Sequence, residues 1–329
     1  MGAQSSQEQQ VKPLIAQRAD PFIHRHADGH YYFVASVPEY DRIEIRKSRT
    51  VAGLATAVPS IVWRKHETGM LSANIWAPEL HHIGGKWYVY FAAARTAETN
   101  EGLFDHRMYV LENEGDDPTA GEWTEKGQLR AAWESFSLDA TTFEHRGVRY
   151  LVWAQKDPDI AGNSNLYVSR MQNPWTLEGP QTRLTLPEYD WEIIGFKVNE
   201  GPAFLHCGGR VFLSYSASAT DANYCMGLLE ADEDADLLDA ASWRKSAQPV
   251  LTTDPSLGLY GPGHNSFTVA EDGETNLLVF HARTYRDIEG DPLYDPNRHT
   301  FVAELKLDDE GRPDFRASVA AMVGAGAAY

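Results

Sequence analysis

The chain has 329 residues, of which 43% are hydrophobic and 23% charged, and its formal net charge is −18. This composition is ordinary for a globular protein with a sizeable core, but so acidic a surface repels phosphate backbones and acidic polymers. We therefore expect a neutral partner rather than nucleic acid, and no apolar run is long enough to make a membrane the partner.

The chain begins with a polar segment, MGAQSSQEQQ, and residues 1–14 are predicted to form a disordered tail. The segment lacks a basic stretch followed by an apolar region, so no signal peptide is visible. The localisation stays open between an intracellular protein and a secreted protein whose leader has been removed.

From residue 15 to residue 329 the sequence predicts one domain built from a repeat of about sixty residues. In each repeat a Gly-containing or polar turn leads into a strand of aromatic and aliphatic residues. These strands lie in DGHYYFVAS (28–36), GGKWYVYFAA (84–93), RGVRYLVWAQ (146–155), GGRVFLSYSA (208–217) and GETNLLVFHA (273–282). A shorter strand precedes each of them and two more follow.

Four antiparallel strands repeated five times predict an all-β fold, a single-domain five-bladed β-propeller around a central channel. The expected blades cover approximately residues 17–70, 74–132, 136–187, 197–252 and 260–318. The fourth strand is least clear in blade five, where PDFRASVA occupies its place. The longest loops, 95–105, 187–198 and 284–298, are where binding residues are expected.

The first strand of each repeat starts with a polar residue: Asp20, Glu79, Asp139, Glu200 and His264. Innermost propeller strands converge on the axis, so this spacing predicts four carboxylates and one histidine at one mouth of the channel. One such residue is more often a solvated turn residue, but a cluster of like charges costs free energy and indicates catalysis or metal binding.

Glycoside hydrolysis is a reaction that needs converging carboxylates, one to protonate the leaving oxygen and one to activate water or attack the sugar. A third carboxylate has a role beside the acid, because like-charge repulsion raises the pKa of its neighbour. The motifs G-x-S-x-G, H-E-x-x-H, the P-loop and paired C-x-x-C are absent, so the sequence gives the competing classes little support.

The segments around these residues resemble glycoside hydrolase family 43, in its branch of α-L-arabinofuranosidases and exo-1,5-α-L-arabinanases. The motifs are RADPFI around Asp20, WAPELH (76–81), SLDA around Asp139, NEGPA around Glu200, YGPGHNS (260–266), HARTY (281–285) and DPNRH (295–299). The resemblance implies release of terminal α-L-arabinofuranosyl residues from arabinan or its oligosaccharides, which are neutral plant cell-wall carbohydrates. It also implies an inverting single displacement that requires no cofactor.

The resemblance assigns a role to each catalytic carboxylate. Asp20 matches the general base that activates water, Glu200 matches the general acid, and Asp139 matches the residue that raises the pKa of Glu200 and orients it. Glu79 is not catalytic in the family, and we expect it to support another residue, for example an arginine.

Four more residues are expected at the substrate: Trp76, Trp191, His264 and Arg283. His264 matches an axial histidine that faces water or a calcium ion, although calcium prefers oxygen ligands, so calcium in the channel and an ordinary buried histidine both stay open. Arg283 is expected to contact the sugar, to pair with a channel carboxylate, or both. Trp76 either stacks on a sugar or packs between blades, and Trp191 would line the aglycone side.

The two cysteines, Cys207 and Cys225, are expected at opposite ends of one strand of blade four, some ~18 Å apart at ~3.3 Å per residue. That separation is too great for a disulfide, so two free thiols are predicted.

Three alternatives remain at this point. A β-xylosidase or an endo-arabinanase would share the fold, although only eleven residues follow blade five where many xylosidases of the family carry a β-sandwich. A carbohydrate-binding propeller without catalysis belongs to another class, and the clustered carboxylates argue against it. A fructan-cleaving propeller also uses an early aspartate, but its usual N-D-P-N motif is absent at Asp20.

Overall fold

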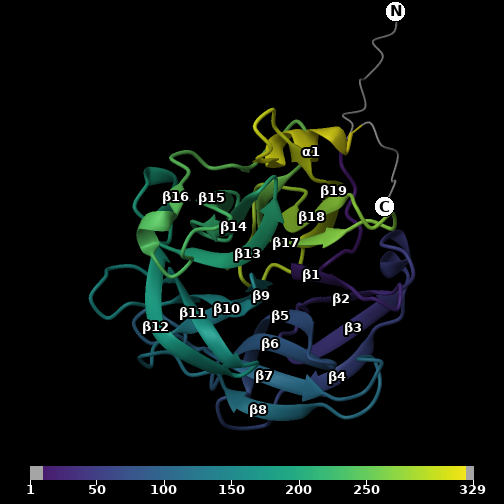
Figure 1. Cartoon of the computed structure of the whole chain (residues 1–329), viewed down its shortest axis with the longest axis vertical. Coiled ribbons are helices and arrows are strands. Elements are labelled where there is room, and N and C mark those ends of the chain that lie inside the picture. The colour runs from purple at the N-terminus through teal and green to yellow at the C-terminus, as the bar shows by residue number, and fades with distance from the viewer. Residues whose placement is uncertain (1–9, 324–329) are drawn as a thin grey trace, which may run out of the picture.

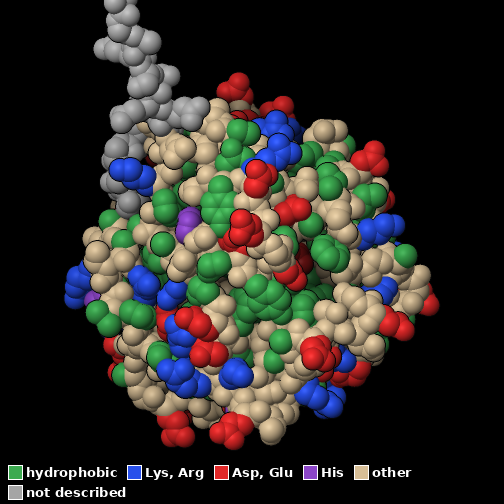
Figure 2. Space-filling view, turned by 180° about the vertical axis from the view of Figure 1, so that it is seen from behind, with side chains coloured by type: hydrophobic (Ala, Val, Ile, Leu, Met, Phe, Trp, Pro, Cys, Tyr) green, Lys and Arg blue, Asp and Glu red, His purple; other side chains and the backbone are tan. Residues whose placement is uncertain are grey.

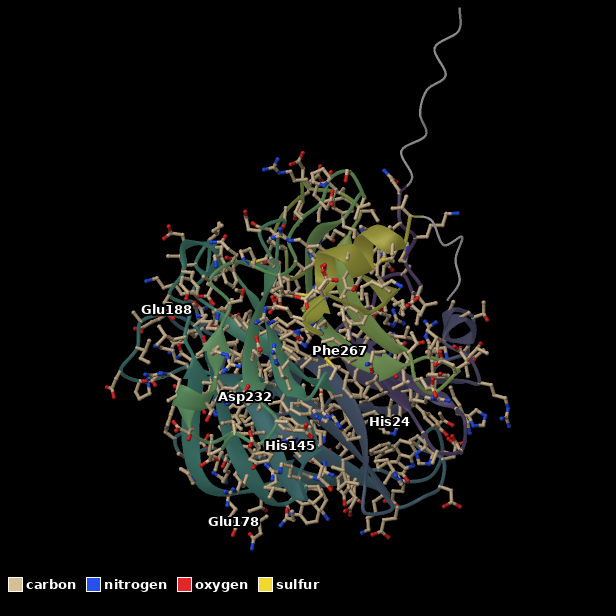
Figure 3. All side chains as sticks on the ribbon, turned by 45° about the horizontal axis from the view of Figure 1, so that its top comes forward. His24, His145, Glu178, Glu188, Asp232 and Phe267 are labelled. Atoms are coloured by element: carbon tan, nitrogen blue, oxygen red, sulfur yellow. The ribbon has the colours of Figure 1, made fainter. Side chains whose placement is uncertain are left out.

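The computed structural model describes residues 10–323 and confirms an all-β propeller with five blades around one axis (Figure 1). The innermost strands β1, β5, β9, β13 and β17 lie next to one another in a closed ring. Figure 3 looks onto the face where these strands end, with His24 of β1, His145 of β9 and Phe267 of β17 near the axis.

Every blade is an antiparallel sheet whose strands follow one another in chain order. Blade one contains β1 (Ala19–Arg25), β2 (Tyr31–Ser36), β3 (Arg42–Ser48) and β4 (Ser60–Arg64). Blade two contains β5 (Ala73–Ile83), β6 (Lys86–Ala94), β7 (Arg107–Asn113) and β8 (Thr124–Gln128). Blade three contains β9 (Ser137–His145), β10 (Val148–Gln155), β11 (Asn165–Asn173) and β12 (Thr176–Thr185).

Blade four contains β13 (Asn199–Cys207), β14 (Arg210–Ala217), β15 (Cys225–Asp232) and the short β16 (Arg244–Lys245). Blade five contains β17 (Tyr260–Val269), β18 (Asn276–Arg283) and β19 (His299–Glu304). Three 3₁₀ turns lie in the connections: η1 (Ala52–Ala55), η2 (Asp190–Glu192) and η3 (Ala240–Ser242).

The burial of the strands follows from the stacking of the blades. Neighbouring blades cover both faces of a sheet, so the six residues of β2 are all buried and those of β6 nearly all. The outer strands β4 and β8 are largely exposed and carry charged residues, which discourages pairing with another chain at these edges.

The prediction of a fourth strand in blade five is wrong. Pro313–Asp314 (β21) pairs only with Lys306–Leu307 (β20), and the chain continues as helix α1 (Phe315–Ala321). The side chain of Asp314 accepts a hydrogen bond from the Ala317 backbone N–H at 2.9 Å, which is the cap that begins a helix.

The beginning of the chain occupies the free edge of β19 instead. The N–H groups of Leu14 and Ile15 donate to the Thr300 carbonyl at 2.8 and 3.3 Å, and the Thr300 N–H donates to the Ile15 carbonyl at 2.9 Å. Val11 is buried, and its N–H donates to the Leu257 carbonyl. The disordered tail expected over residues 1–14 is therefore wrong for residues 11–14, and residues 1–9 lie outside the described part.

The prediction for the cysteines is confirmed. Cys207 and Cys225 are both free, one at the hairpin before β14 and the other paired across from the end of that strand.

Candidate active site

A pocket opens on the channel axis at the face where the innermost strands begin. It encloses about 330 Å³, which suits a small ligand, and each blade contributes to its lining. The lining includes Asp20, Trp76, Asp139, Glu200 and His264, one from each blade. Figure 2 shows this face, with a hollow near its middle that holds acidic side chains and has hydrophobic side chains beside it.

Loops complete the wall of the pocket. The three loops singled out from the sequence contribute residues 99 and 102–104, residues 196 and 198, and residues 291–293. A fourth connection, which joins β14 to β15, contributes residues 218–220 and Tyr224, and no motif in the sequence pointed to it.

A β-bulge near the start of each innermost strand aims the pocket residues. The bulge contains one residue with positive φ, a conformation that costs free energy for any residue but glycine. These residues are Asp20 (54°), Ala77 (46°), Asp139 (55°), Gly201 (54°) and His264 (42°). Glu79 thus lies two residues beyond the bulge residue of its blade and Glu200 one residue before it, so the expected five-fold equivalence holds for only three positions.

Asp20 is buried and surrounded by hydrogen-bond donors and a cation. The Ser36 hydroxyl donates to its Oδ2 at 2.5 Å, and the Arg298 Nη1 lies 3.6 Å from its Oδ1. The Nδ1 atoms of His264 and His281 each lie 3.3 Å from the same Oδ1. Burial alone would raise the pKa of Asp20, but His264, Arg298 and His281 together hold it well below its usual range.

Glu200 has surroundings of the opposite kind. Burial raises its pKa to about 7, and the negative charge of Asp20 adds to the rise, while the hydrogen bond from the Tyr224 hydroxyl at 2.8 Å opposes it. Asp139 accepts a hydrogen bond from the Gly201 N–H at 2.9 Å, and Gly201 directly follows Glu200. Burial, followed by the charge of Glu200, raises the pKa of Asp139 well above its ordinary value.

Glu79 does not line the pocket. Its Oε2 lies 2.9 Å from the Nε2 of His81, so its partner is a histidine rather than the arginine that we expected. Burial raises the pKa of Glu79 to about 8, so near neutral pH this carboxyl adds little charge to the channel.

Arg283 is not among the residues that line the pocket, so its contact with the sugar stays a prediction. Its guanidinium is buried and donates to the carbonyls of Thr220 and Pro292 and to the carboxylate of Asp295, so it fastens loop to loop. The arginine that lines the pocket is Arg298, whose Nη2 donates to the Tyr40 hydroxyl at 2.7 Å. Arg298 lies in the DPNRH motif (295–299), which was the signal that could have found it.

The two tryptophans differ in their outcome. Trp76 lines the pocket, but one face of its ring stacks on His106 with centroids 3.9 Å apart, and its Nε1 has no hydrogen-bond partner in the described part of the chain. Trp191 does not line the pocket. Its Nε1 donates to the Ala247 carbonyl and its ring stacks on Tyr215, because the turn η2 directs it into blade four.

His264 lines the pocket with its Nδ1 directed at Asp20 and, at 3.9 Å, at Asp139. Burial lowers its pKa, although the charges of Asp20 and Glu79 oppose the shift. Within residues 10–323, no three His, Cys, Asp or Glu side chains are placed to hold a metal ion together. Calcium in the channel therefore stays a prediction.

Three comparisons with known proteins agree with this geometry. The family model for glycosyl hydrolases family 43 matches residues 11–313. An extracellular exo-α-(1→5)-L-arabinofuranosidase of Streptomyces avermitilis is 55% identical over 94% of this chain, and one of Streptomyces chartreusis is 60% identical over 85%. The chain spans 64% of the length of the first protein and 84% of the second.

A solved structure is also similar along its whole length. The crystal structure of an α-L-arabinofuranosidase from Lactobacillus brevis superposes with a TM-score of 0.91 at 57% identity, and the match covers 93% of this chain and 96% of that one.

A five-bladed propeller with three carboxylates in one axial pocket defines a class of glycoside hydrolases. The chain belongs to glycosyl hydrolases family 43. Among the described residues, no helix is both long and apolar enough to cross a membrane.

Proposed function

We propose that this protein is an exo-acting α-L-arabinofuranosidase that removes terminal arabinofuranosyl residues from arabinan or its oligosaccharides with inversion at the anomeric carbon. The observation that carries the proposal is a pair of carboxyl groups with opposite pKa shifts in one pocket. The pKa of Asp20 is lowered, whereas that of Glu200 is raised to about 7. Such a pair supplies a base and an acid at the same pH.

Asp20 acts as the general base. It is ionised at neutral pH because Arg298 and the Ser36 hydroxyl stabilise its carboxylate. It takes a proton from a water molecule as the water oxygen forms a bond to the anomeric carbon. In an inverting enzyme the base and acid carboxyl groups stand roughly 6.5–9.5 Å apart, which leaves room for this water.

Glu200 acts as the general acid, and Asp139 assists it. The protonated carboxyl of Glu200 gives its proton to the glycosidic oxygen as the bond from that oxygen to the anomeric carbon breaks. Burial and the charge of Glu200 raise the pKa of Asp139, and two carboxyl groups coupled in this way do not readily ionise together, which favours the acid form of Glu200. The hydrogen bond from the Gly201 N–H to Asp139 fixes the strand that carries Glu200.

The shape of the pocket supports action at a chain end. Loops from blades two, four and five close around the catalytic carboxylates and bound a cavity of about 330 Å³, which suits the end of a chain. The names of the similar arabinofuranosidases support arabinose-containing carbohydrate as the substrate, and two of these names support action outside the cell.

The test is the product formed from linear arabinan. We expect arabinose as the sole early product, and proton NMR should show the β-anomer first, because inversion of an α-linked residue yields it. A ladder of oligosaccharides would mean endo action, and the α-anomer appearing first would mean retention. Release of xylose but not arabinose from nitrophenyl glycosides would support the β-xylosidase alternative.

A further inference from the structure

Tyr224 lies at the floor of the pocket, and none of the sequence motifs contains it. It directly precedes β15, is 1% exposed, and donates a hydrogen bond from its hydroxyl to the Oε1 of Glu200 at 2.8 Å. Burial, followed by the charges of Glu200 and Asp139, raises the pKa of Tyr224 well above its usual value, so the hydroxyl keeps its proton.

The ring of Tyr224 is closely packed. It stacks on His281 with centroids 5.6 Å apart and an angle of 7°, and the Nδ1 of His281 accepts the Asp20 N–H. A Cβ at Gly263, the cross-strand partner of His281, would come within 2.5 Å of the ring, so the absence of a side chain there admits the tyrosine. A ring held this closely cannot swing its hydroxyl away from Glu200.

A chain of hydrogen bonds fixes the direction in which Tyr224 donates. The His264 N–H donates to the Ser216 Oγ at 2.7 Å, and the Ser216 hydroxyl is hydrogen-bonded to the Tyr224 hydroxyl. Ser216 accepts the His264 N–H and still has its own proton to donate to the Tyr224 oxygen, because Tyr224 uses its proton towards Glu200.

We propose that Tyr224 is a positioning residue that decides which oxygen of Glu200 carries the catalytic proton. Since Oε1 accepts from Tyr224, the proton of the acid form resides on Oε2. This inference rests on the proposed function: Oε2 delivers its proton to the leaving glycosidic oxygen, the bond between that oxygen and the anomeric carbon breaks, and the carboxylate left behind keeps the Tyr224 hydrogen bond.

The test compares Tyr224→Phe with wild type on two substrates. A linear arabino-oligosaccharide has a poor leaving group that needs the proton, whereas nitrophenyl α-L-arabinofuranoside has one that leaves with little help. We expect kcat to fall by about 10- to 100-fold on the oligosaccharide and by less than about 3-fold on the nitrophenyl substrate, because only general-acid assistance is weakened. Equal losses on both substrates would overturn the proposal.

The pH profile gives a second readout that a merely structural role would not move. Loss of a donor to the ionised carboxylate raises the pKa of Glu200, so the alkaline limb should move up by about one pH unit in Tyr224→Phe. The matched control is Tyr167→Phe in β11, a buried tyrosine that donates to the Asp157 carboxylate at 2.6 Å outside the pocket, and its profile should stay unchanged. An alkaline limb that does not move in Tyr224→Phe contradicts the proposal.

A third measurement does not depend on the substrate. Carbon-13 NMR of labelled glutamate carboxyls, with the Glu200 signal identified by its loss in Glu200→Gln, should show the titration midpoint rising by about one unit in Tyr224→Phe. An unchanged midpoint contradicts the inference about Tyr224. If wild-type protein cleaves neither substrate, the proposed function fails, and the titration still decides the role of the tyrosine.

Discussion

Two serines occupy the same position in different blades, and their hydrogen bonds connect one to Asp20 and the other to Glu200. Ser36 of β2 pairs across from Ala19, accepts the N–H of Ala77, and donates directly to Asp20. Ser216 of β14 pairs across from Glu200, accepts the N–H of His264, and reaches the carboxyl group through Tyr224.

The neighbours beyond the serines make the difference between the two sides. Burial raises the pKa of both carboxyl groups, but on the Asp20 side Arg298 and two histidines reverse that effect. On the Glu200 side the negative charge of Asp20 adds to the rise, and Tyr224 and Arg298 oppose it only in part. Both carboxyl groups are buried, so burial does not determine which one is the base and which the acid. The sign of the neighbouring charge does.

Removal of each catalytic group should give the largest effect and the sharpest contrast. Asp20→Asn is expected to lower kcat by about 10²- to 10⁴-fold on both arabino-oligosaccharide and nitrophenyl arabinofuranoside, because both reactions need activated water. Glu200→Gln should lose a similar factor on the oligosaccharide but much less on the nitrophenyl substrate. Steady-state kinetics on the two substrates checks this. The same pattern of losses for both variants would contradict the assignment of Asp20 as base and Glu200 as acid.

Arg298→Met should weaken the base side next. Without the guanidinium 3.6 Å from its Oδ1, the pKa of Asp20 rises towards the ordinary range. The acid limb of the pH profile, below which Asp20 is protonated, should therefore move up by at least about one unit, while the alkaline limb moves less. A profile of kcat/KM against pH measures both limbs, and an unmoved acid limb would show that Arg298 does not set the ionisation of Asp20.

Asp139→Asn should act on the acid side with the opposite sign to Tyr224→Phe. Loss of a neighbouring negative charge makes ionisation of Glu200 easier, so the alkaline limb should move down by about one unit. The measurement is again kcat/KM against pH on the oligosaccharide. A limb that moves up instead would mean that Asp139 is itself protonated and donates to Glu200.

The two serines give the smallest effects and the closest comparison. Each Ser→Ala change removes one donor, so Ser36→Ala should raise the acid limb and Ser216→Ala the alkaline limb, each by a few tenths of a pH unit. Thermal unfolding of both variants provides the control for folding. Shifts of the same limb in both variants would refute the separate roles.

The repeat in the sequence was enough to predict the propeller, because each blade buries its own run of aromatic and aliphatic residues between two neighbours. The same repeat brought Asp20, Asp139 and Glu200 to one pocket. The repeat could not show where each residue lies relative to the bulge of its strand. A bulge shifts the following side chains by one residue, and the motifs around Glu79 and Glu200 contain no sign of that shift.

The role of a residue could not be predicted from the sequence where it depends on how the loops fold. Arg283 and Arg298 both lie in family motifs, so the motifs do not distinguish them. Only the folded structure shows that Arg283 donates to the carbonyls of Thr220 and Pro292 and so links two loops. Tyr224 has no motif at all, and its role depends on the space left by Gly263, which is distant in sequence. The capping of α1 by Asp314 likewise outweighed a pattern that continued the blade repeat.

The most direct test of the central claim is the pH dependence of kcat/KM for the wild-type enzyme on a linear arabino-oligosaccharide and on nitrophenyl arabinofuranoside. We expect activity on the oligosaccharide to fall as the pH rises through about 7, the pKa of Glu200, with a much weaker fall on the nitrophenyl substrate. Both substrates should keep their activity below the ordinary range of aspartate ionisation, because Asp20 stays ionised there. Identical alkaline limbs on the two substrates, or an acid limb at the ordinary aspartate pKa, would contradict the division of the pocket into an acid side and a base side.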